Sequence, residues 1–352
     1  MGVRPALPER DLDHVLEHTG GLWEELRGER LFVTGGTGFF GGWMVESLLH
    51  ADERLGLGVR AHLLTRDPGR FRTAVPHIAS HPSITLSAGD IREFAFPDAP
   101  FSTILHMATE TELGGSAAAS FSTAVAGTAR VLQFAAQCGA RRLLLTSSGA
   151  VYGTQPPEIE RLAEDYLGGP RSEDPAAGYG HGKRAAEFLC AAAAADTGLE
   201  VKIARCFGLV GPLLPLDANF AVGNFIRDAI AGGPVFVAGD GTPRRSYLYA
   251  ADLAAWLWII LLRGVPGRPY NVGSEEEVSI AALAHLVADT VCPGCEVRVA
   301  QSSAVDRIPA RYVPSTQLPT SGLGLGVWID LAEGIRRTAD WYTAGPTHQR
   351  GA

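Results

Sequence analysis

Tyr179 and Lys183 are the side chains of this sequence best suited to proton transfer. They stand four residues apart in Tyr-Gly-His-Gly-Lys, and residues at that spacing are neighbours on one face of a helix. A free tyrosine has a pKa of about 10, which is too high for a base near neutral pH. A nearby ammonium group favours the phenolate and lowers that pKa. The pair therefore predicts a tyrosine that exchanges a proton with a substrate hydroxyl.

Two serines supply a second group for the same chemistry. Ser147 and Ser148 follow the apolar segment Arg142 to Thr146, which we expect to be a buried strand. A hydroxyl from either serine can hydrogen-bond the substrate oxygen on which the proton moves. A Tyr/Lys pair is common in helices by chance, so its catalytic interpretation depends on the other motifs of the chain.

A glycine-rich segment, Thr34-Gly-Gly-Thr-Gly-Phe-Phe-Gly41, lies between an expected strand and an expected helix. Its spacing lets the backbone turn tightly and approach a pyrophosphate, while the helix N-terminus attracts negative charge. In that setting Lys183 would also hold the nicotinamide ribose, and an oxidised ring would lower the pKa of Tyr179 further. The alternative is a purely structural turn. We predict that a nicotinamide dinucleotide contacts Gly35, Thr37, Gly38, Phe39, Phe40 and Gly41.

The end of the second expected strand bears on which dinucleotide is bound. An acidic residue there binds the ribose 2′-hydroxyl of NAD, whereas an arginine suits the 2′-phosphate of NADP. Thr65 occupies the strand end, and Arg66 and Asp67 follow it. The two charges are also typical of a solvated turn, and Asp67 leaves NAD open. The cofactor prediction is NAD(P)(H) with a slight lean to NADP, through Arg66.

Short apolar segments alternate with helical stretches in the first part of the chain. Apolar strands without period-two alternation are typical of a parallel sheet covered on both faces. The predicted fold is α/β, a doubly wound parallel sheet of the Rossmann type with a smaller C-terminal α/β substrate lobe. Strands are expected at 30–34, 59–65, 84–86, 103–106, 142–146 and 201–207, and helices at 43–50, 121–137 and 182–195.

The same pattern divides the chain into three parts. Residues 1–29 form a helical extension, with an amphipathic stretch at about 11–27. Residues 30–211 form the dinucleotide-binding domain, to which a segment at about 243–273 returns. Residues 212–352, which have more glycine and proline and less regular alternation, form most of the substrate-binding lobe.

The composition limits the possible partners. The chain has 352 residues, 46% of them hydrophobic and 19% charged, with a formal net charge of −8. An acidic chain without a basic patch argues against nucleic acid and against an anionic membrane surface. The most apolar run, 253–262, is too short to span a bilayer and is expected to be a buried helix.

The cysteines and the lack of a recognisable secretory signal indicate a cytoplasmic protein. Cys292-Pro-Gly-Cys295 has the spacing of a metal or redox motif, but no second pair and no histidine partner follows it. We interpret it as a turn with two incidental thiols, with a zinc or redox site as the alternative. None of the ten histidines pairs with a carboxylate at metal-ligand spacing, so no metal site is assigned.

Together these motifs resemble those of extended short-chain dehydrogenase/reductases, the group of nucleotide-sugar epimerases, dehydratases, decarboxylases and 4-ketoreductases. The similarity runs from Leu31 to about Tyr342 and leaves the N-terminal extension outside. Besides the glycine segment and the Tyr/Lys pair, the matching motifs are Asp90, His106-Met-Ala, Thr146-Ser-Ser-Gly-Ala-Val-Tyr-Gly153, Asn224-Phe-Ile, Gly239-Asp-Gly-Thr, Arg245-Ser-Tyr and Asn271-Val-Gly273.

The resemblance implies a nucleoside diphosphate sugar as substrate, and a homodimer formed through the helix at 121–137 and the tyrosine helix. A bidentate arginine suits a diphosphate, which makes Arg245 the favoured substrate contact. For Asn224 a helix cap, and for Arg311 a surface ion pair, are the alternatives. The implied catalytic residues are Ser148, Tyr179 and Lys183. The implied further cofactor contacts are Asp90, Ile91, Met107 and Ala108, and the substrate contacts are Ser147, Ser148, Asn224, Arg245 and Arg311.

The two positions after Ser148 separate the reactions of this group. Related dehydratases carry Asp-Glu there, and decarboxylases carry a glutamate at the place of Ala150, whereas this chain has Gly149 and Ala150. Without a carboxylate, a 4,6-dehydratase lacks its usual acid and base. We rank a 4-epimerase first, because small residues leave a keto-sugar room to turn, and an NADPH-dependent 4-ketoreductase second, because of Arg66. A dehydratase, a decarboxylase and a non-catalytic dinucleotide-binding sensor are further alternatives.

Two features depart from the pattern of the group or carry no information. The asparagine usually found three residues before Gly127-Thr128 is Ala124 here, so a supporting contact of the active site is missing or replaced. The segment Thr109 to Ser120, where a substrate-facing loop is expected, is rich in Gly, Ala and Ser and gives no clue to specificity.

Overall fold

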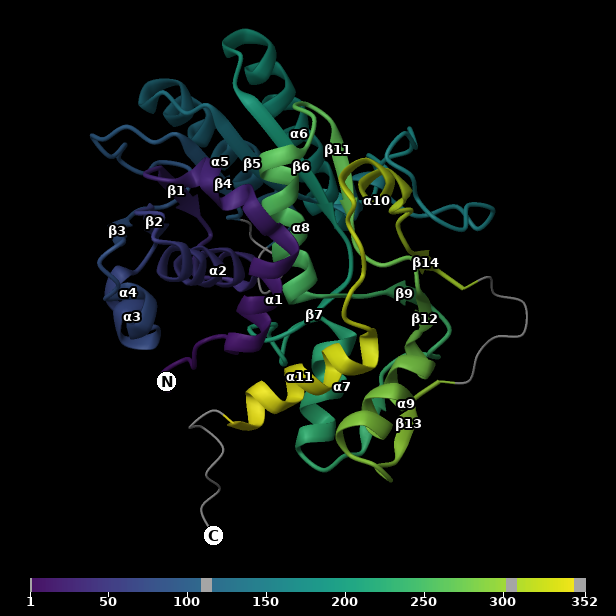
Figure 1. The fold of residues 1–352 in the computed structure, drawn as a ribbon. Helices are drawn as coiled ribbons and strands as arrows, with labels where there is room; N and C mark the ends of the chain where they lie inside the picture. The colour runs from purple at the N-terminus through teal and green to yellow at the C-terminus, as the bar shows by residue number, and fades with distance from the viewer. Residues whose placement is uncertain (1, 109–115, 302–308, 345–352) are drawn as a thin grey trace. The chain divides into compact units, whose positions relative to one another are not determined.

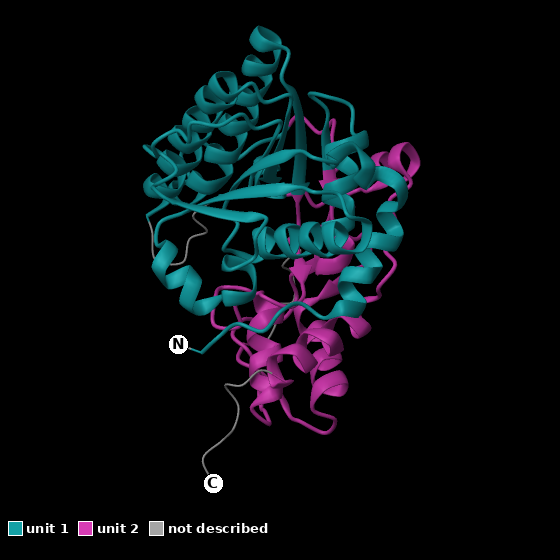
Figure 2. Cartoon of the chain, turned by 60° about the vertical axis from the view of Figure 1, so that its left-hand side comes forward, with its two compact units in different colours: residues 1–153, 168–205, 254–270 teal, residues 154–167, 206–253, 271–352 magenta. Residues whose placement is uncertain are grey.

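The computed structural model describes residues 2–108, 116–301 and 309–344, so most of the expected loop Thr109 to Ser120 lies outside the described residues. The chain forms two compact units, which are coloured separately in Figure 2. Unit 1 comprises 1–153, 168–205 and 254–270, and unit 2 comprises 154–167, 206–253 and 271–352. These boundaries differ from the expected ones, because 154–167 belongs to unit 2 and the return to unit 1 covers only 254–270.

Unit 1 is built on a seven-stranded sheet with the order β11-β6-β5-β4-β1-β2-β3. The pairs β1–β2, β2–β3, β1–β4 and β4–β5 are parallel, which confirms the doubly wound fold. The order reverses between β1 and β4, and ligands of open α/β sheets bind at such a reversal, at the carboxyl ends of the strands. The strands are β1 (Arg30–Thr34), β2 (Arg60–Thr65), β3 (Ile84–Ala88), β4 (Thr103–His106), β5 (Arg142–Ser148), β6 (Glu200–Cys206) and β11 (Pro269–Val272).

Helices cover both faces of this sheet (Figure 1). On one face, α5 (Ala117–Cys138) and α6 (Gly178–Thr197) pack side by side, and Phe134 and Cys190 join the hydrophobic cluster beneath them. On the other face lie α2 (Phe39–Leu55) and α8 (Ala250–Arg263). Burying apolar side chains on both faces of the sheet is the main force that holds this arrangement.

The N-terminal extension is packed into unit 1. It forms α1 (Glu9–Thr19) and a 3-10 helix, η1 (Gly20–Leu26), and α1 lies against α2. The fully buried ring of Trp23 lies 4.9 Å, centroid to centroid, from that of Trp258 in α8. Trp258 in turn donates through Nε1 to the Ser47 hydroxyl of α2 at 2.9 Å. The extension therefore supports the helix that follows the glycine segment.

Short helices connect several strands of unit 1. The turn expected at 67–69 is the start of a helix, because the Asp67 carboxylate accepts a hydrogen bond from the Arg70 backbone at 2.8 Å and Pro68 suits a first turn. Among the described residues, no helix is long and apolar enough to cross a membrane. The short helices are α3 (Pro68–Ala74), α4 (Pro76–Ala79), η2 (Gly149–Tyr152) and η3 (Pro175–Ala177).

Unit 2 contains three small sheets and four helices within the described residues. β9 (Arg244–Ser246) lies between β12 (Glu277–Ser279) and β14 (Arg311–Tyr312). β7 (Leu209–Val210) pairs with β10 (Leu248–Tyr249), and β8 (Val235–Val237) pairs with β13 (Val297–Val299). The helices are α7 (Ala221–Ile230), α9 (Ile280–Val291), α10 (Gln317–Leu323) and α11 (Leu331–Ala344), and α9 packs against α7 and α11.

Candidate functional site

The turn between β1 and α2 requires glycine at two positions. Gly35 has φ +72°, and a Cβ there would lie 2.6 Å from the backbone of Met107 and Ala108. A Cβ on Gly41 would lie 2.2 Å from the Gly35 carbonyl oxygen. The first glycine lets the turn pass close to the end of β4, and the second lets α2 start directly on the turn.

The first turn of α2 is open to an anion. Gly38 precedes the helix, and no side chain caps this end, so the first N–H groups after it have no intrahelical acceptor. A Cβ on Gly38 would meet nothing closer than 3.5 Å, and Thr37 and Gly38 are exposed, while Phe39 and Phe40 are half-buried. The residues present therefore fit a dinucleotide pyrophosphate bound at this helix N-terminus.

The predicted contacts near the cofactor's adenosine lie around the ends of β2 and β3. Arg66 is exposed, whereas the Asp67 carboxylate caps α3. Asp90 forms an ion pair with Arg92 at 2.7 Å, and the pKa of Asp90 is lowered mainly by that hydrogen bond, with a smaller effect of the charge of Arg66. Arg66 and Asp90 therefore lie close enough to interact. Ile91 is buried against α5, where a Cβ on Gly127 would be 3.0 Å from it.

His106 links three elements around the cofactor turn. Its Nδ1 lies 2.9 Å from the Thr34 hydroxyl of β1, and its Nε2 lies 3.0 Å from the Thr128 hydroxyl of α5. The Thr34 hydroxyl also accepts a hydrogen bond from the Ala108 backbone at 3.2 Å. Burial, and next the charge of Lys183, lower the pKa of His106 to about 3. The ring is therefore neutral near pH 7 and fixes the ends of β1 and β4 relative to α5.

The three predicted catalytic residues stand on neighbouring elements of unit 1. Tyr179 lies in the first turn of α6 and is partly exposed, and the Lys183 Nζ is 5.9 Å from the centroid of its ring. Lys183 is buried and donates to the Thr146 carbonyl oxygen of β5 at 2.8 Å. The Ser148 hydroxyl, at the end of β5, accepts a hydrogen bond from the Ala150 backbone at 3.1 Å. An ammonium group is thus held beside a partly exposed phenol.

Ser147 points to a buried acid. Its hydroxyl donates to Glu187 Oε1 at 2.5 Å, and this hydrogen bond is buried. Glu187 forms an ion pair with Arg205 of β6 at 2.7 Å, and Arg205 donates to the Tyr152 hydroxyl at 2.9 Å. Of the two serines expected to meet the substrate, the structure directs Ser147 into this network, which leaves Ser148 as the better candidate.

The other three predicted substrate residues, Asn224, Arg245 and Arg311, belong to unit 2, and two of them lie on neighbouring strands. In the register of β9 and β14, Arg311 is opposite Arg244 and Tyr312 is opposite Arg245. Opposite residues share a face of a sheet and successive residues alternate, so Arg245 and Arg311 point to opposite faces. Accordingly, Glu277 pairs with both Arg244 and Arg311 at 2.9 Å, while the Arg245 guanidinium lies 5.8 Å from the Tyr312 ring centroid.

This separation affects the role expected for Arg311. Its partner Glu277 already compensates its charge, in agreement with the ion-pair alternative, although the pair is only partly exposed. The third predicted residue, Asn224, lies within α7, and its side-chain oxygen accepts from Arg227 at 3.2 Å. It does not cap that helix, because the cap position is Phe220.

Comparisons with known proteins agree with this architecture. The sequence profile of the NAD dependent epimerase/dehydratase family matches residues 31–273. The chain belongs to this family. A UDP-glucuronic acid decarboxylase of Xenopus tropicalis is 30% identical over 91% of this chain and 74% of that protein. One from Arabidopsis thaliana is 29% identical over 87% of this chain and 86% of that protein.

The solved structure of a related protein supports the fold described above for this chain. The dTDP-glucose 4,6-dehydratase DesIV of Streptomyces venezuelae, solved with NAD bound, has a TM-score of 0.74 and 25% sequence identity. The alignment covers 89% of this chain and 96% of that one. The resemblance to extended short-chain dehydrogenase/reductases that the motifs indicate is therefore confirmed.

Packing explains one departure of this family member from the usual pattern. Helices α5 and α6 approach closely beside Ala124, where a Cβ on Gly182 would lie 3.0 Å from the Ala124 Cβ and from the Phe121 Cα. A small residue at 124 permits this approach.

Sequence reasoning did not identify Glu187 or Arg205. One signal was available for each: Glu187 follows Lys183 by four residues on the same helix, and Arg205 is a charged residue between apolar residues near the end of an expected strand. A charge is rarely buried unless it is paired, so a buried arginine predicts a buried acid.

The interpretation of Cys292 and Cys295 as two incidental thiols was wrong. The two cysteines form a disulfide across the turn that ends α9, with their Cα atoms 5.6 Å apart. The turn brings the sulfurs together because the Cys295 backbone N–H bonds to the Cys292 carbonyl oxygen at 2.9 Å. Cys138, Cys190 and Cys206 form no disulfide in the described part of the chain, and the last two are buried.

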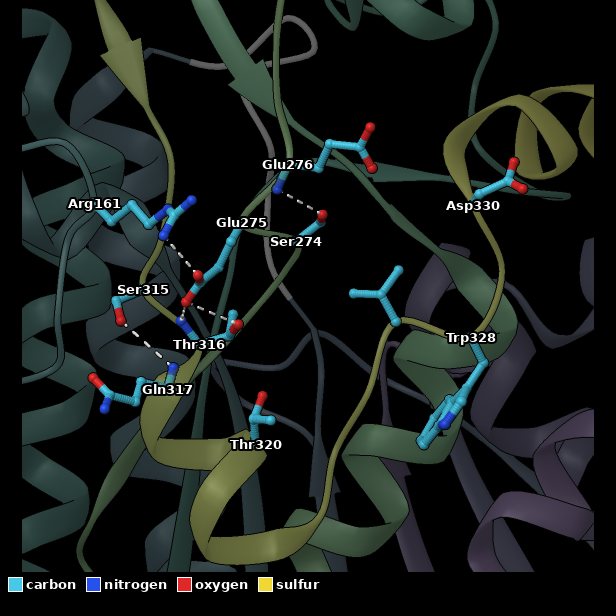
Figure 3. A pocket seen from close by; sticks show the side chains of 11 residues that line it. Arg161, Ser274, Glu275, Glu276, Ser315, Thr316, Gln317, Thr320, Trp328 and Asp330 are labelled. Carbon is cyan, nitrogen blue, oxygen red and sulfur yellow. Dashed lines mark hydrogen bonds and ion pairs between the residues drawn. The ribbon is translucent and has the colours of Figure 1, made fainter.

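A polar pocket of about 670 Å³ in unit 2 contains none of the predicted site residues among its described lining (Figure 3). Arg161 and Glu275 point toward one another there and form an ion pair at 2.9 Å. Glu275 also accepts a hydrogen bond from the Thr316 backbone at 2.6 Å. These contacts tie the segment 154–167 to the start of α10, which gives the pocket wall a structural role.

Proposed function

We propose that this chain is an NAD(P)-dependent enzyme that modifies a nucleotide sugar through oxidation at sugar C4, and that its net reaction is 4-epimerisation. The observation that carries the proposal is the Tyr179/Lys183 pair beside the end of β5, with Gly149 and Ala150 following Ser148. Oxidation and reduction at one carbon need a hydride carrier and one proton-transfer group. They need no carboxylate at 149 or 150.

Each residue has a definite task in this scheme. When bound, the nicotinamide cofactor supplies the acceptance and return of the C4 hydride. Tyr179 takes the proton of the C4 hydroxyl and gives it back, and Ser148 hydrogen-bonds the same oxygen. Lys183 holds the nicotinamide ribose and favours the phenolate of Tyr179. The backbone between Gly35 and Gly41 binds the pyrophosphate.

We infer a preference for NADP over NAD from the side chains at the end of β2. Arg66 is exposed beside Asp90, so its guanidinium can reach a 2′-phosphate. The acid that would bind a 2′-hydroxyl, Asp67, instead caps α3. The relative DesIV was solved with NAD, so the preference of this chain is a point on which it is expected to differ.

We infer a nucleoside diphosphate sugar as substrate and a homodimer as the assembly. Arg245, whose guanidinium lies 5.8 Å from the Tyr312 ring centroid, is the proposed contact of the diphosphate. For the dimer, Phe121 of α5 is 41% exposed and Phe188 of α6 is 72% exposed, which makes this helix pair an apolar surface. Replacing Phe188 with aspartate is expected to convert a dimer to a monomer in light scattering, and an unchanged mass would contradict this interface.

A second candidate, decarboxylation of a nucleoside diphosphate hexuronic acid, is favoured by the names of the relatives from Xenopus tropicalis and Arabidopsis thaliana. A ketone at C4 lies β to the carboxylate carried by C5. When CO2 leaves, the electron pair of the bond from C5 to the carboxylate carbon stays on C5 and is delocalised into that ketone. Protonation at C5 and reduction at C4 complete the reaction without net use of cofactor. The absence of a glutamate at 150 counts against it.

The experiment that tests these candidates incubates the purified chain and NAD(P) with UDP-glucose, UDP-galactose and UDP-glucuronic acid, and in a separate sample with NADPH and a UDP-4-keto sugar. Products are read by NMR and mass spectrometry, and the reduced nicotinamide by its absorbance. Interconversion of the 4-epimers at constant mass, with no net change in reduced cofactor, supports the proposal. Loss of CO2 from the acid supports the second candidate, and stoichiometric NADPH consumption with a 4-keto sugar would establish a ketoreductase.

A further inference from the structure

The face of α6 that carries the catalytic pair continues to a third ionisable side chain. Tyr179, Lys183 and Glu187 follow one another at four-residue intervals, so each lies one turn beyond the last. Lys183 and Glu187 also hold successive residues of β5, because Lys183 donates to the Thr146 carbonyl and Glu187 accepts from the Ser147 hydroxyl. A carboxylate in this position can draw the lysine charge away from the phenol.

Arg205 binds the Glu187 carboxylate. Its Nη2 donates to Glu187 Oε2 at 2.7 Å, and its Nε lies 3.1 Å from Oε1. Its Nη1 donates to the Tyr152 hydroxyl, and the guanidinium lies 4.8 Å from the centroid of that ring. The side chains of Arg205 and Glu187 are only 14% and 10% exposed, so water screens their interaction little.

The other titratable groups near Lys183 are neutral at physiological pH. Burial lowers the pKa of His106 to about 3 and raises the pKa of the Cys190 thiol to about 12. Two further groups on α6 are directed elsewhere: Arg184 donates to the Val151 and Gly168 carbonyls, and His181 lies 3.2 Å from a carbonyl of the segment before η3. Among the described residues, Glu187 and Arg205 are therefore the charges that can change the effect of Lys183.

We propose that Arg205 is a positioning residue, which neutralises Glu187 and thereby keeps the charge of Lys183 directed at Tyr179 and at the nicotinamide ribose. The inference rests on the proposed function, because it concerns the same tyrosine. This role explains why unit 1 keeps the buried charges of Glu187 and Arg205, because replacing a buried ion pair with apolar side chains often leaves a protein equally stable.

The test is an absorbance titration of Tyr179 in the full-length protein, with NAD(P) bound and without it. Each variant is compared with the same variant carrying Tyr179→Phe, so that the difference reports one phenol. Arg205→Gln leaves Glu187 uncompensated, and the Tyr179 titration is expected to move up by about one pKa unit. In the double variant Arg205→Gln/Glu187→Gln it is expected to return close to wild type.

A conservative variant separates charge from packing. Arg205→Lys keeps a cation beside Glu187 but loses the bidentate contact, and it is expected to leave the Tyr179 titration near wild type. An equal shift in Arg205→Lys and Arg205→Gln, or a shift that persists in the double variant, would overturn the proposal. If Arg205→Gln does not fold, Glu187→Gln decides: it leaves a net cation and must move the titration down.

The titration also separates this inference from the proposed function. It reads the phenol directly and needs no turnover of a nucleotide sugar. A chain that turns over none of the tested substrates but shows the predicted pattern of shifts would contradict the proposed reaction and support the role of Arg205. Full epimerase activity with no shift in any variant would support the proposed reaction and contradict the role of Arg205.

Discussion

The two units hold the side chains of the proposed site in different ways. In unit 1, Lys183, Glu187 and Ser147 are buried, and each is bound to a strand or to another side chain at 2.5–2.8 Å. In unit 2, Arg245 and Arg311 lie on short strands, are partly exposed, and point to opposite faces of their sheet. Proton transfer requires fixed geometry, whereas an ionic contact with a diphosphate tolerates a flexible arginine.

The difference follows from the elements that carry the residues. β5 is a buried strand of the core sheet, and α6 buries one face that includes Lys183 and Glu187, so the side chains on that face are fixed by packing. β9 and β14 have three and two residues, so their side chains are fixed by ion pairs such as Glu277 with Arg311. We therefore expect changes in unit 1 to affect the chemical step and changes in unit 2 to affect substrate affinity.

The largest effect is expected from Tyr179→Phe. Removing the phenol oxygen removes the proton-transfer group, and kcat is expected to fall by about 10²–10⁴-fold. Binding of the cofactor, measured by its fluorescence, is expected to change little. Tyr166→Phe, which removes the same atom from a partly exposed tyrosine of unit 2, serves as the control. Similar kcat values for the two variants would contradict the division of roles between the units.

The next effect concerns the pH dependence of stability and the buried ring of His106. Its pKa is about 3 in the folded chain against an ordinary value of 6.5, so the unfolded state binds more protons between these values. The contribution of His106 to the stability of the wild type is therefore fully present above about pH 6.5 and is lost as the pH falls toward 3.

The variant His106→Asn tests this contribution. It is expected to be less stable at neutral pH, because the links to Thr34 and Thr128 change. Its loss of stability in acid is expected to be smaller than that of the wild type by a few kcal/mol. Urea unfolding at a series of pH values measures the difference, and His181→Asn, on the partly exposed face of α6, is the control. Parallel acid profiles for wild type and His106→Asn would exclude this account.

A smaller effect is expected in unit 2, where the sheet offers a matched pair of arginines. Arg245→Gln is expected to raise KM about 10–100-fold with kcat little changed, because a charge-assisted contact with the diphosphate is lost. Arg244→Gln, at the neighbouring position and facing Glu277, is expected to leave KM nearly unchanged. Steady-state kinetics with the substrate identified by product analysis would measure both. Equal effects would show that the two faces do not differ in function.

The smallest effect is expected for cofactor choice. Arg66→Gln is expected to reduce the ratio of NADP to NAD affinity by about tenfold, the value of one ion pair with a phosphate at an exposed site. Arg70→Gln, an exposed arginine of α3, is the control. Calorimetric titration with both dinucleotides gives the ratios. If the wild type prefers NAD, Arg66 does not bind the ribose 2′-phosphate, which would contradict the inference.

The fold could be predicted from the sequence because it follows from local patterns, and the position of Tyr179 and Lys183 on one helix face is such a pattern as well. The glycines of the Gly35–Gly41 segment predict the turn before α2, and the spacing of Tyr179 and Lys183 defines a helix face. The network around Glu187 could not be predicted, because Ser147, Tyr152 and Arg205 come together only when β5, η2 and β6 are placed.

The sequence could not predict the geometry of unit 2 for the same physical reason. Whether Arg245 and Arg311 share a face depends on the register of two very short strands, which no periodicity marks. The pairing of Cys292 with Cys295 likewise depends on the conformation of one turn. The sequence did not predict the short elements, because tertiary contacts specify them. It predicted the long elements, because their own residue pattern specifies them.

The most direct test of the central claim is to follow the hydrogen at sugar C4. A nucleotide sugar carrying deuterium at C4 is incubated with the chain and its bound cofactor, and the product is examined by NMR. The account predicts that the 4-epimer forms with the deuterium still at C4, because the same hydride returns to the same carbon. Conversion with the C4 deuterium replaced by solvent hydrogen, or conversion in the Tyr179→Phe variant at the wild-type rate, would contradict it.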